Sequence, residues 1–463
     1  MSDAAREILA PHPQLSVAVI EAERRAPRSS LACVVGQNVR FSTESLESYF
    51  FARWDPVAYD ALLVAAAVEF CDRTQHRPVF AWGRDFELSV PVHDPDRWNQ
   101  KPVADTLHDA LNFLTGDRWS ISFCPRKAPL DPPRQVQFPL NPNISAVIPF
   151  SDGLDSRAVA GLMALSLGDK LIRIRLGHTL SRPKQPFTAV PYKVLRGKRA
   201  FVESSARARG FKFALIAGIA AYFANASHII VPESGQGALG PALLPVGQGY
   251  EDYRSHPLFT SRMEQFLAAI FACQVSFQFP QIWQTKGETL SRFVSECADA
   301  SSWAQTWSCW QQARQASVDQ KKRQCGICAA CMLRRLSIHA AGLTEPKSSY
   351  VWEDLGAATF ETGAAAAFDK KKITPAMREY AIAGTLHLDH LAALAHSPAN
   401  ARVLSLNAIQ LSRSCNLALT ETRRRLERLL AQHEREWKSF IESLGPNSFI
   451  AHWAIHEAND HAA

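Results

Sequence analysis

The stretch covering residues 144–167 constrains the fold of this chain more than any other part of the sequence. Residues 144–150 form a short apolar run of strand length, and residues 157–167 carry apolar side chains at helical spacing. Between them, residues 151–156 are small and polar, with a glycine where the backbone must turn sharply. The pattern predicts a strand, a tight turn and a helix. Such a turn directs backbone N–H groups and the positive end of a helix dipole at one point, which suits a phosphate or pyrophosphate.

This turn resembles the SGGxDS signature of the PP-loop ATP pyrophosphatases, which form acyl-adenylates and other adenylated intermediates. The match reads S-x-G-x-D-S, with Ser151, Gly153, Asp155 and Ser156 at the signature positions and Asp152 in place of its first glycine. A carboxylate beside polyphosphate is repulsive unless Mg²⁺ bridges them or the side chain turns outward. On their own, the same residues could form an ordinary turn in which Asp155 and Ser156 cap the helix.

The residues after the turn continue an alternation of strands and helices. Residues 171–177 alternate like a strand, residues 203–226 read as a long helix, and HIIV reads as a third strand. This βαβαβ order predicts an α/β fold with a parallel sheet and right-handed crossovers. Ligands of such sheets bind beyond the carboxyl ends of the strands. We therefore expect the 151–156 loop, the segment after Leu176 and residues 233–237 to converge.

Three regions are expected along the chain. Residues 1–140 mix strand-like and helix-like segments and end in a proline-rich linker, which predicts an N-terminal α+β accessory domain. Residues 141–348 form the PP-loop domain. Residues 349–463 form a helical region that begins with a Gly- and Ala-rich stretch, read as a hinge. Its apolar stripe predicts packing on the core with solvated arginines between, and a protein- or nucleic-acid-binding face is the alternative.

Composition excludes several other classes. No run of about 18 apolar residues suggests a membrane span, and the N-terminus has no signal-peptide core, so we expect a cytoplasmic protein without a membrane partner. The net charge of +7 describes a mildly basic surface, which leaves nucleotides, RNA or an acidic protein open as partners. Ten cysteines in such a chain do not indicate a disulfide scaffold.

Four of these cysteines form a second anchor. Cys325, Cys328 and Cys331 read C-x2-C-x2-C, and Cys309 lies upstream of them. This spacing suits a closed, structural four-Cys Zn²⁺ site, with Gly326 allowing the tight turn of the knuckle. An iron–sulfur cluster and buried free thiols are the alternatives, and Cys273 or Cys297 could replace Cys309.

The two anchors occur in the order found in one family. The chain from about residue 144 to 343 resembles the 7-cyano-7-deazaguanine synthases of queuosine biosynthesis, the QueC family. That family's motifs have counterparts here in the 151–156 loop, in Arg209 at a helix start, in the 280–288 segment P-Q-I-W-Q-T-K-G-E, and in the run C-G-I-C-A-A-C-M-L-R. The joint occurrence of these motifs is far more specific than any one of them.

The resemblance implies roles for individual residues. Asp155, which would orient the loop or bind Mg²⁺, and Lys286, which would place a point charge on a phosphate, are the expected catalytic residues. The remaining expected residues are, for ATP, Ser151, Asp152, Gly153, Leu154, Ser156 and Arg209, for the substrate, Glu233, Ser234 and Gly235, and for structural Zn²⁺, Cys309, Cys325, Cys328 and Cys331.

Each of these residues also has an ordinary interpretation. Lys286 could be a surface lysine in a Lys–Glu pair, Arg209 a solvated helix residue and Glu233 an exposed carboxylate. His256 is expected to be a turn residue, and no catalytic histidine is predicted.

The departures from the family point to a modified activity. The synthases are about half as long, and their substrate loop is rich in Asp, Tyr and Cys, whereas this chain has ESGQGALGPALLPVGQGYEDYRSHPLF, so the substrate contacts are expected to be rebuilt. The extended form resembles the QueC-like component, the QatC type, of bacterial anti-phage defence systems. For those relatives the resemblance implies joining a 7-deazaguanine to a protein amino terminus.

The expected function is therefore adenylation of 7-carboxy-7-deazaguanine by ATP, followed by amide formation with the amine of a partner protein encoded nearby. The first alternative is a free 7-cyano-7-deazaguanine synthase that uses ammonia and ATP. The second is a non-catalytic nucleotide-binding scaffold, which Asp152 favours and the intact Ser151, Gly153, Asp155 and Ser156 disfavour. Nucleic acid is not expected as a direct substrate.

Overall fold

The computed structural model describes residues 14–21, 26–42, 55–78, 82–127, 143–177, 187–246, 250–311, 315–394, 396 and 400–454. The N-terminal segment judged not to be a signal peptide and most of the proline-rich linker lie outside the described residues. The chain divides into two compact units made of separated segments. Unit 1 contains Met1–Phe150, Leu167–Val231 and Asp252–Gln278, and unit 2 contains Ser151–Ser166, Pro232–Glu251 and Phe279–Ala463.

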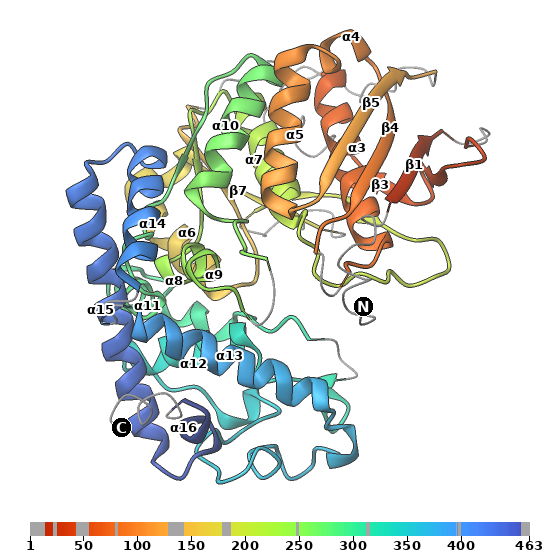
Figure 1. Cartoon of the computed structure of the whole chain (residues 1–463). Coiled ribbons are helices and arrows are strands. Elements are labelled where there is room, and N and C mark those ends of the chain that lie inside the picture. Colours follow the sequence, from red (N-terminus) through yellow and green to blue (C-terminus); the bar gives the residue numbers. More distant parts are fainter. Residues whose placement is uncertain are drawn as a thin grey trace. The chain divides into compact units, whose positions relative to one another are not determined.

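The N-terminal part of unit 1 is a four-stranded parallel sheet in the order β2-β1-β4-β5. Its strands are β1 (Gln14–Ile20), β2 (Leu31–Val34), β4 (Asp85–Val92) and β5 (Arg118–Pro125). Helix α3 (Pro56–Thr74) packs on β4, and α5 (Lys101–Thr115) packs on β5, with the short α4 (Pro95–Trp98) beside them (Figure 1). Alternate side chains along the strands are buried, as a sheet covered on one face requires. Gly116 ends α5 with φ 69°, the left-handed conformation that glycine adopts at helix C-termini.

The second sheet of unit 1 has five strands in the order β11-β10-β6-β7-β8, all of them parallel. They are β6 (Ala146–Pro149), β7 (Leu171–Leu176), β8 (Thr188–Val190), β10 (His228–Ile230) and β11 (Ser276–Gln278). Helices α7 (Arg209–Ala224) and α10 (Pro257–Phe271) belong to the same unit, as do the 3₁₀ turn η1 (Gly168–Lys170) and the antiparallel pair β3 (Val39–Phe41) and β9 (Tyr192–Val194). The predicted α/β class with a parallel sheet is confirmed.

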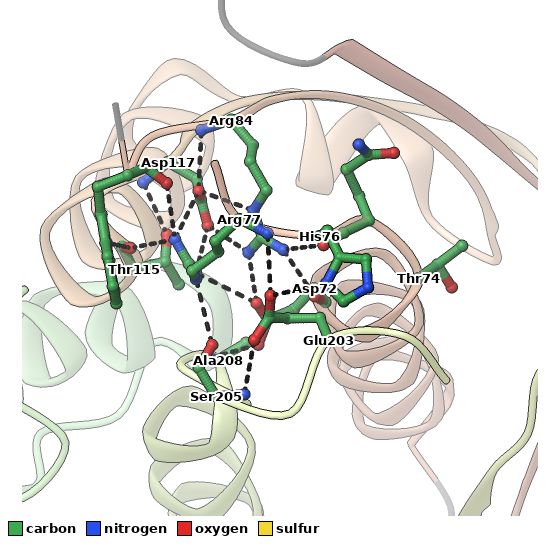
Figure 2. A network of polar contacts seen from close by, with 12 residues as sticks. Asp72, Thr74, His76, Arg77, Arg84, Thr115, Asp117, Glu203, Ser205 and Ala208 are labelled. Carbon is green, nitrogen blue, oxygen red and sulfur yellow. Dashed lines mark hydrogen bonds and ion pairs between the residues drawn. The ribbon is translucent and has the colours of Figure 1, made fainter. Parts of the chain in front are cut away.

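Helix α7 begins at Arg209 and not at residue 203, because the backbone before it is bonded elsewhere. Asp72 Oδ2 accepts a hydrogen bond of 2.9 Å from the Ala208 N–H. The Glu203 carboxylate accepts another of 2.9 Å from the Arg77 N–H. Figure 2 shows this polar network of unit 1, in which Asp72 also binds the Arg77 guanidinium. These side chains hold the segment in a non-helical path up to the first turn of α7.

Unit 2 is mostly helical. Its helices are α6 (Leu154–Leu167, the last residue of which is assigned to unit 1), α8 (Gly235–Ala238), α9 (Gly240–Leu243), α11 (Lys286–Glu296), α12 (Ala329–Ala340), α13 (Pro375–Ala393), α14 (Ala401–Ser414), α15 (Leu419–Leu444) and α16 (Phe449–Ala454). A small hairpin of β12 (Ser317–Val318) and β13 (Lys321–Lys322) and the 3₁₀ turns η2 (Ala300–Gln305), η4 (Lys347–Ser349) and η5 (Lys370–Lys372) complete it. Helices α12, α13 and α15 pack on one another (Figure 1), so the predicted helical C-terminal region is confirmed.

The Gly- and Ala-rich stretch that begins this region is not a hinge. Phe360 and Phe368 are 2% and 3% exposed and belong to the same hydrophobic core as the four cysteines. A Cβ at Gly363 would lie 2.5 Å from the Asp354 carbonyl oxygen, so the glycine is needed for close packing. Small residues allow close packing here, although such a composition predicts flexibility.

The apolar stripe of α15 packs as predicted. Leu426, Leu429 and Leu430 are buried, while Leu419 at the start of the helix is exposed. The arginines between them lie at the surface, where Arg424 and Arg425 both pair with Glu421. Among the described residues, no helix is both long enough and apolar enough to cross a bilayer.

Candidate functional site

The loop after β6 is closed by its own side chains. The Ser151 N–H donates to Ser156 Oγ over 2.8 Å, and the Gly153 N–H donates to Ser151 Oγ over 3.1 Å. Helix α6 begins at Leu154, so Ser156 lies in its first turn and reaches back to the loop instead of capping the helix. The first N–H groups of α6 have no carbonyl oxygen within the helix to bond, because that partner would lie four residues earlier in the chain. The loop therefore presents the amides of a helix N-terminus, the arrangement that binds anions.

Asp155 is the buried charge at this helix start. Its side chain is 7% exposed, and its Oδ2 lies 2.8 Å from the Nζ of Lys286, which is 12% exposed. Neither Asp155 oxygen has a partner with hydrogen-bond geometry among the described residues, and the Lys286 ammonium forms an ion pair with it. A buried carboxylate normally accepts several hydrogen bonds. The Asp155 carboxylate therefore has lone pairs that can still bind a ligand. Lys286 itself is largely buried and is not a solvated surface lysine.

Helix α11 presents Lys286 as its first residue. Thr285 is the N-cap: its Oγ1 accepts from the Glu288 N–H over 3.1 Å, and Glu288 accepts from the Thr285 N–H over 2.9 Å. The [ST]-K-x-E element of the 280–288 segment is thus a capping box in physical terms. The box fixes the backbone on both sides of Lys286 and directs its side chain from a rigid helix start.

A second carboxylate approaches the same place. A Cβ added to Gly237, in α8, would lie 2.4 Å from Glu233 Oε2 and 3.6 Å from Asp155 Oδ2. Both carboxylates therefore lie close to the position that a side chain at residue 237 would occupy. Together with Lys286 they bring two negative charges and one positive charge into a small volume. Such a group can accept a divalent cation or reorganise around a polyphosphate.

The other predicted residues lie in different surroundings. Asp152 is exposed, which fits a side chain turned outward, while Leu154 is buried in an apolar cluster. Ser234 is fully buried and its Oγ has no hydrogen-bond partner among the described residues. A Cβ at Gly235 would lie 2.3 Å from the Ile282 carbonyl oxygen, so this glycine serves close packing.

Arg209 and His256 belong to unit 1, whereas the group around Asp155 belongs to unit 2. Arg209 is the first residue of α7, with its guanidinium 5.3 Å from the centre of the Phe213 ring. His256 caps α10 by accepting from the Leu258 N–H over 3.1 Å, and burial lowers its pKa to about 3. It is a neutral structural residue at a helix start. The segment after Leu176, expected to converge on the loop, lies largely outside the described residues.

The four predicted cysteines form one buried cluster. The sulfur atoms of Cys309, Cys325, Cys328 and Cys331 all lie within 4.8 Å of one another. The Cys325 and Cys331 sulfurs are 3.8 Å apart, which is about the edge of a tetrahedron with Zn–S bonds of about 2.3 Å. Gly326 has φ 89°, the left-handed turn that the knuckle needs. The donor set fits a structural Zn²⁺.

The cysteine cluster is connected to the 151–156 loop by a short path of hydrogen bonds. The Asp152 carbonyl oxygen accepts from the Trp307 N–H over 2.7 Å, and the Trp307 indole N–H donates to the Cys309 carbonyl oxygen over 2.7 Å. Arg334, the arginine that ends the family motif, is fully buried; it donates to Thr306 Oγ1 over 2.6 Å and pairs with Glu345. This arginine holds the cysteine-bearing segment and is not in contact with Asp155 or Lys286.

Gln236 and Gly237 belong to the 233–237 segment that was expected to converge on the loop, but the sequence predicted no individual role for either. Gln236 Oε1 accepts from the Lys286 N–H over 2.8 Å, and Gly237 leaves the space used by Glu233. The GQG sequence gave a signal for Gly237, because two glycines after a predicted strand suggest close backbone approach. For Gln236 the partner lies fifty residues away in sequence, and no local pattern points to it.

The family comparison covers part of this site. Residues 242–342 match the model of the family described as QueC, queuosine biosynthesis protein QueC. No curated protein matches the chain. The matched stretch includes Lys286 and the four cysteines but ends before α15 and begins after the 151–156 loop. Over these residues, the chain is similar to QueC.

Proposed function

We propose that this chain uses ATP to adenylate a 7-deazaguanine carboxylate and then joins the acyl group to an amine. The observation that carries the proposal is the buried Asp155–Lys286 pair next to Glu233, at the first turn of the helix that follows the loop. Similarity to QueC over residues 242–342 supports ATP-dependent chemistry on a deazaguanine, since QueC proteins are ATP-dependent enzymes that form C–N bonds.

The reaction has two steps. A carboxylate oxygen of the substrate attacks the α-phosphorus of ATP, the bond from that phosphorus to the bridging oxygen breaks, and pyrophosphate leaves with the electron pair. The amine nitrogen then attacks the acyl carbon, loses a proton, and AMP leaves. Neither step needs a strong acid or base from the protein, because positioning and charge neutralisation lower both barriers.

The residues of unit 2 supply that positioning. The first amides of α6 and the Lys286 ammonium would hold the phosphates. Asp155 and Glu233 are the residues that would bind Mg²⁺, which would neutralise polyphosphate charge. The Asp155 oxygens can take a cation without losing a hydrogen bond, because neither has a partner with hydrogen-bond geometry in the described structure.

For the acceptor, we propose the amine of a partner protein in a cytoplasmic anti-phage system. The support is that the chain extends far beyond the QueC match on both sides, with residues 1–241 and 343–463 outside it. A larger protein surface suits a macromolecular acceptor better than ammonia does. If the chain instead used ammonia, the product would be free 7-cyano-7-deazaguanine and no protein conjugate would form.

Pyrophosphate exchange tests the proposal. Labelled pyrophosphate should enter ATP only when 7-carboxy-7-deazaguanine is present, and Asp155→Ala should abolish exchange without loss of zinc. Arg118→Ala, at an exposed ion pair in unit 1, is the control and should exchange like the wild type. Exchange without the carboxylate, or full activity of Asp155→Ala, would refute the proposed reaction. Intact mass measurement of candidate acceptors then separates conjugation from nitrile formation.

A further inference from the structure

Helix α15 lies outside the stretch that matches QueC, yet it contacts the first turn of α11 at several points. Thr285 Oγ1 donates to Glu436 Oε1 over 2.6 Å while its lone pair accepts from the Glu288 N–H. Arg428 donates to the other end of the capping box, at Glu288, over 2.7 Å. The capping box in front of Lys286 is therefore held from outside by α15.

The most informative contact passes through Gln236. Its side-chain amide lies between the Lys286 backbone N–H, at 2.8 Å, and the ring of His433 in α15, at 2.7 Å. Because a backbone N–H can only donate, the Gln236 oxygen must face Lys286. The Gln236 NH₂ group must then donate to His433 Nδ1.

The same logic assigns the proton on His433. Nδ1 accepts from Gln236, so the ring proton must be on Nε2, which lies 2.8 Å from the Leu388 carbonyl oxygen in α13. Each atom in this chain of hydrogen bonds has one permitted role. His433 is fully buried and is held neutral, since burial lowers its pKa to about 4. A buried chain with one permitted orientation is a rigid support.

We infer that α15 is part of the site, with His433 as a positioning residue that orients Gln236 and thereby fixes the backbone of Lys286. The inference rests on the proposed role of Lys286 at the phosphates. Glycines permit the close approach: a Cβ at Gly287 would lie 3.3 Å from Glu436 Oε1, and one at Gly235 would lie 2.5 Å from a methyl group of Leu429.

Two variants of His433 separate positioning from packing. His433→Phe keeps an aromatic ring at this position but offers no acceptor to Gln236. His433→Asn loses volume but places Oδ1 where Nδ1 lies. If the residue only fills space, Phe is the milder change; if it orients Gln236, Asn is the milder change.

The readout is the rate at which an amine-acylating reagent labels individual lysines, measured by peptide mass spectrometry. Lys212 is an internal control in unit 1, because it pairs with Glu69 at 2.7 Å and is 14% exposed, much like Lys286. In His433→Phe, Lys286 should be labelled roughly five- to tenfold faster, the factor expected for losing about one hydrogen bond, while Lys212 is unchanged. His433→Asn should label like the wild type.

Unchanged Lys286 labelling in His433→Phe, an equal rise at Lys212, or faster labelling in Asn than in Phe would each overturn the inference. The labelling requires no turnover. If the wild type failed to exchange pyrophosphate, the proposed reaction would fall while the lysine rates would still decide whether α15 positions Lys286. If exchange occurs, kcat should fall in His433→Phe and stay close to the wild-type value in His433→Asn.

Discussion

In unit 1 the carboxylates of Asp72 and Asp117 form ion pairs with two arginines. In unit 2 the carboxylate of Asp155 forms an ion pair with one lysine. Arg84 donates to Asp117 through Nε at 3.1 Å and Nη2 at 2.8 Å, and its Nη2 also reaches Asp72 at 2.5 Å. Arg77 adds a contact of 2.8 Å to Asp117 Oδ2 (Figure 2). Every one of these carboxylate oxygens has a partner, whereas the Asp155 oxygens have none with hydrogen-bond geometry among the described residues.

The difference separates a structural network from a candidate site. A buried ion pair repays the loss of hydration only when its remaining lone pairs are hydrogen-bonded. The unit 1 network meets that condition and connects the end of α3, the start of β4 and the turn before β5. The unit 2 pair does not meet it, and unsatisfied buried groups of this kind are found where a ligand completes them.

The largest effect is expected from breaking the unit 1 network. Arg84→Met leaves two buried carboxylates short of a cation, so the free energy of unfolding should fall by about 3–5 kcal/mol. Arg118→Ala removes an exposed pair with Asp85, which solvent screens, so the free energy of unfolding should stay close to that of the wild type. Denaturant unfolding of both variants measures the contrast. Similar losses in the two variants would mean that the network is no more structural than a surface pair.

The unit 2 pair should behave in the opposite way. The double variant Asp155→Leu/Lys286→Met replaces an imperfectly bonded pair with apolar side chains, so the free energy of unfolding should stay within about 1 kcal/mol of the wild type. Pyrophosphate exchange should fall at least about 100-fold, since the phosphate-binding charge is lost. If the double variant lost as much free energy of unfolding as Arg84→Met, the Asp155–Lys286 pair would be a structural network like the one in unit 1.

The sequence predicted those parts of the site that depend on local spacing. The 151–156 loop and the cysteine knuckle follow from residues close together in the chain, where turn geometry and ligand spacing determine structure. The capping box at Thr285 and Glu288 could also have been read directly, since it follows the S/T-x-x-E pattern.

What the sequence did not predict depends on contacts between distant residues. Gln236 meets His433 across 197 positions, and Asp72 meets Ala208 across 136. The second contact is why α7 starts later than predicted, because a side chain remote in sequence accepts the bond that a longer helix would have used. The hinge prediction failed for the same reason: small residues allow either flexibility or close packing, and distant side chains decide which.

Acidification should affect the two units unequally. Burial lowers the pKa of His387 and His433 in unit 2 to about 4 and that of His256 in unit 1 to about 3. Unfolded histidines have a pKa of about 6.5, so below that pH the unfolded chain binds protons that the folded chain does not. Stability is therefore complete above about pH 6.5 and falls as the pH decreases towards about 4.

Each of these three histidines should cost about 2 kcal/mol between about pH 6.5 and pH 5. Burial also lowers the pKa of His108 in unit 1, but by a smaller shift, so unit 2 should lose more stability than unit 1. Denaturant titrations at several pH values, followed by pulsed proteolysis and peptide mass spectrometry, would report each unit separately. His256→Asn keeps a cap acceptor without a titrating ring and should flatten the curve of unit 1 only. If the free energy of unfolding fell equally steeply with pH in both units of the wild type, the buried histidines would not be the cause of the pH dependence.

The smallest expected effect concerns Gly237, where unit 2 keeps space beside its carboxylates. A methyl group there would lie 2.4 Å from Glu233 Oε2, so Gly237→Ala must displace that carboxylate while gaining about 0.5–1 kcal/mol of backbone stability. Exchange should fall roughly tenfold, as for a small misplacement of a charged group. Gly240→Ala is the matched control, because its Cβ would meet Leu391 at an ordinary 3.4 Å. Full activity in Gly237→Ala would show that Glu233 is not needed beside Asp155, and the candidate site would then reduce to the Asp155–Lys286 pair and the loop.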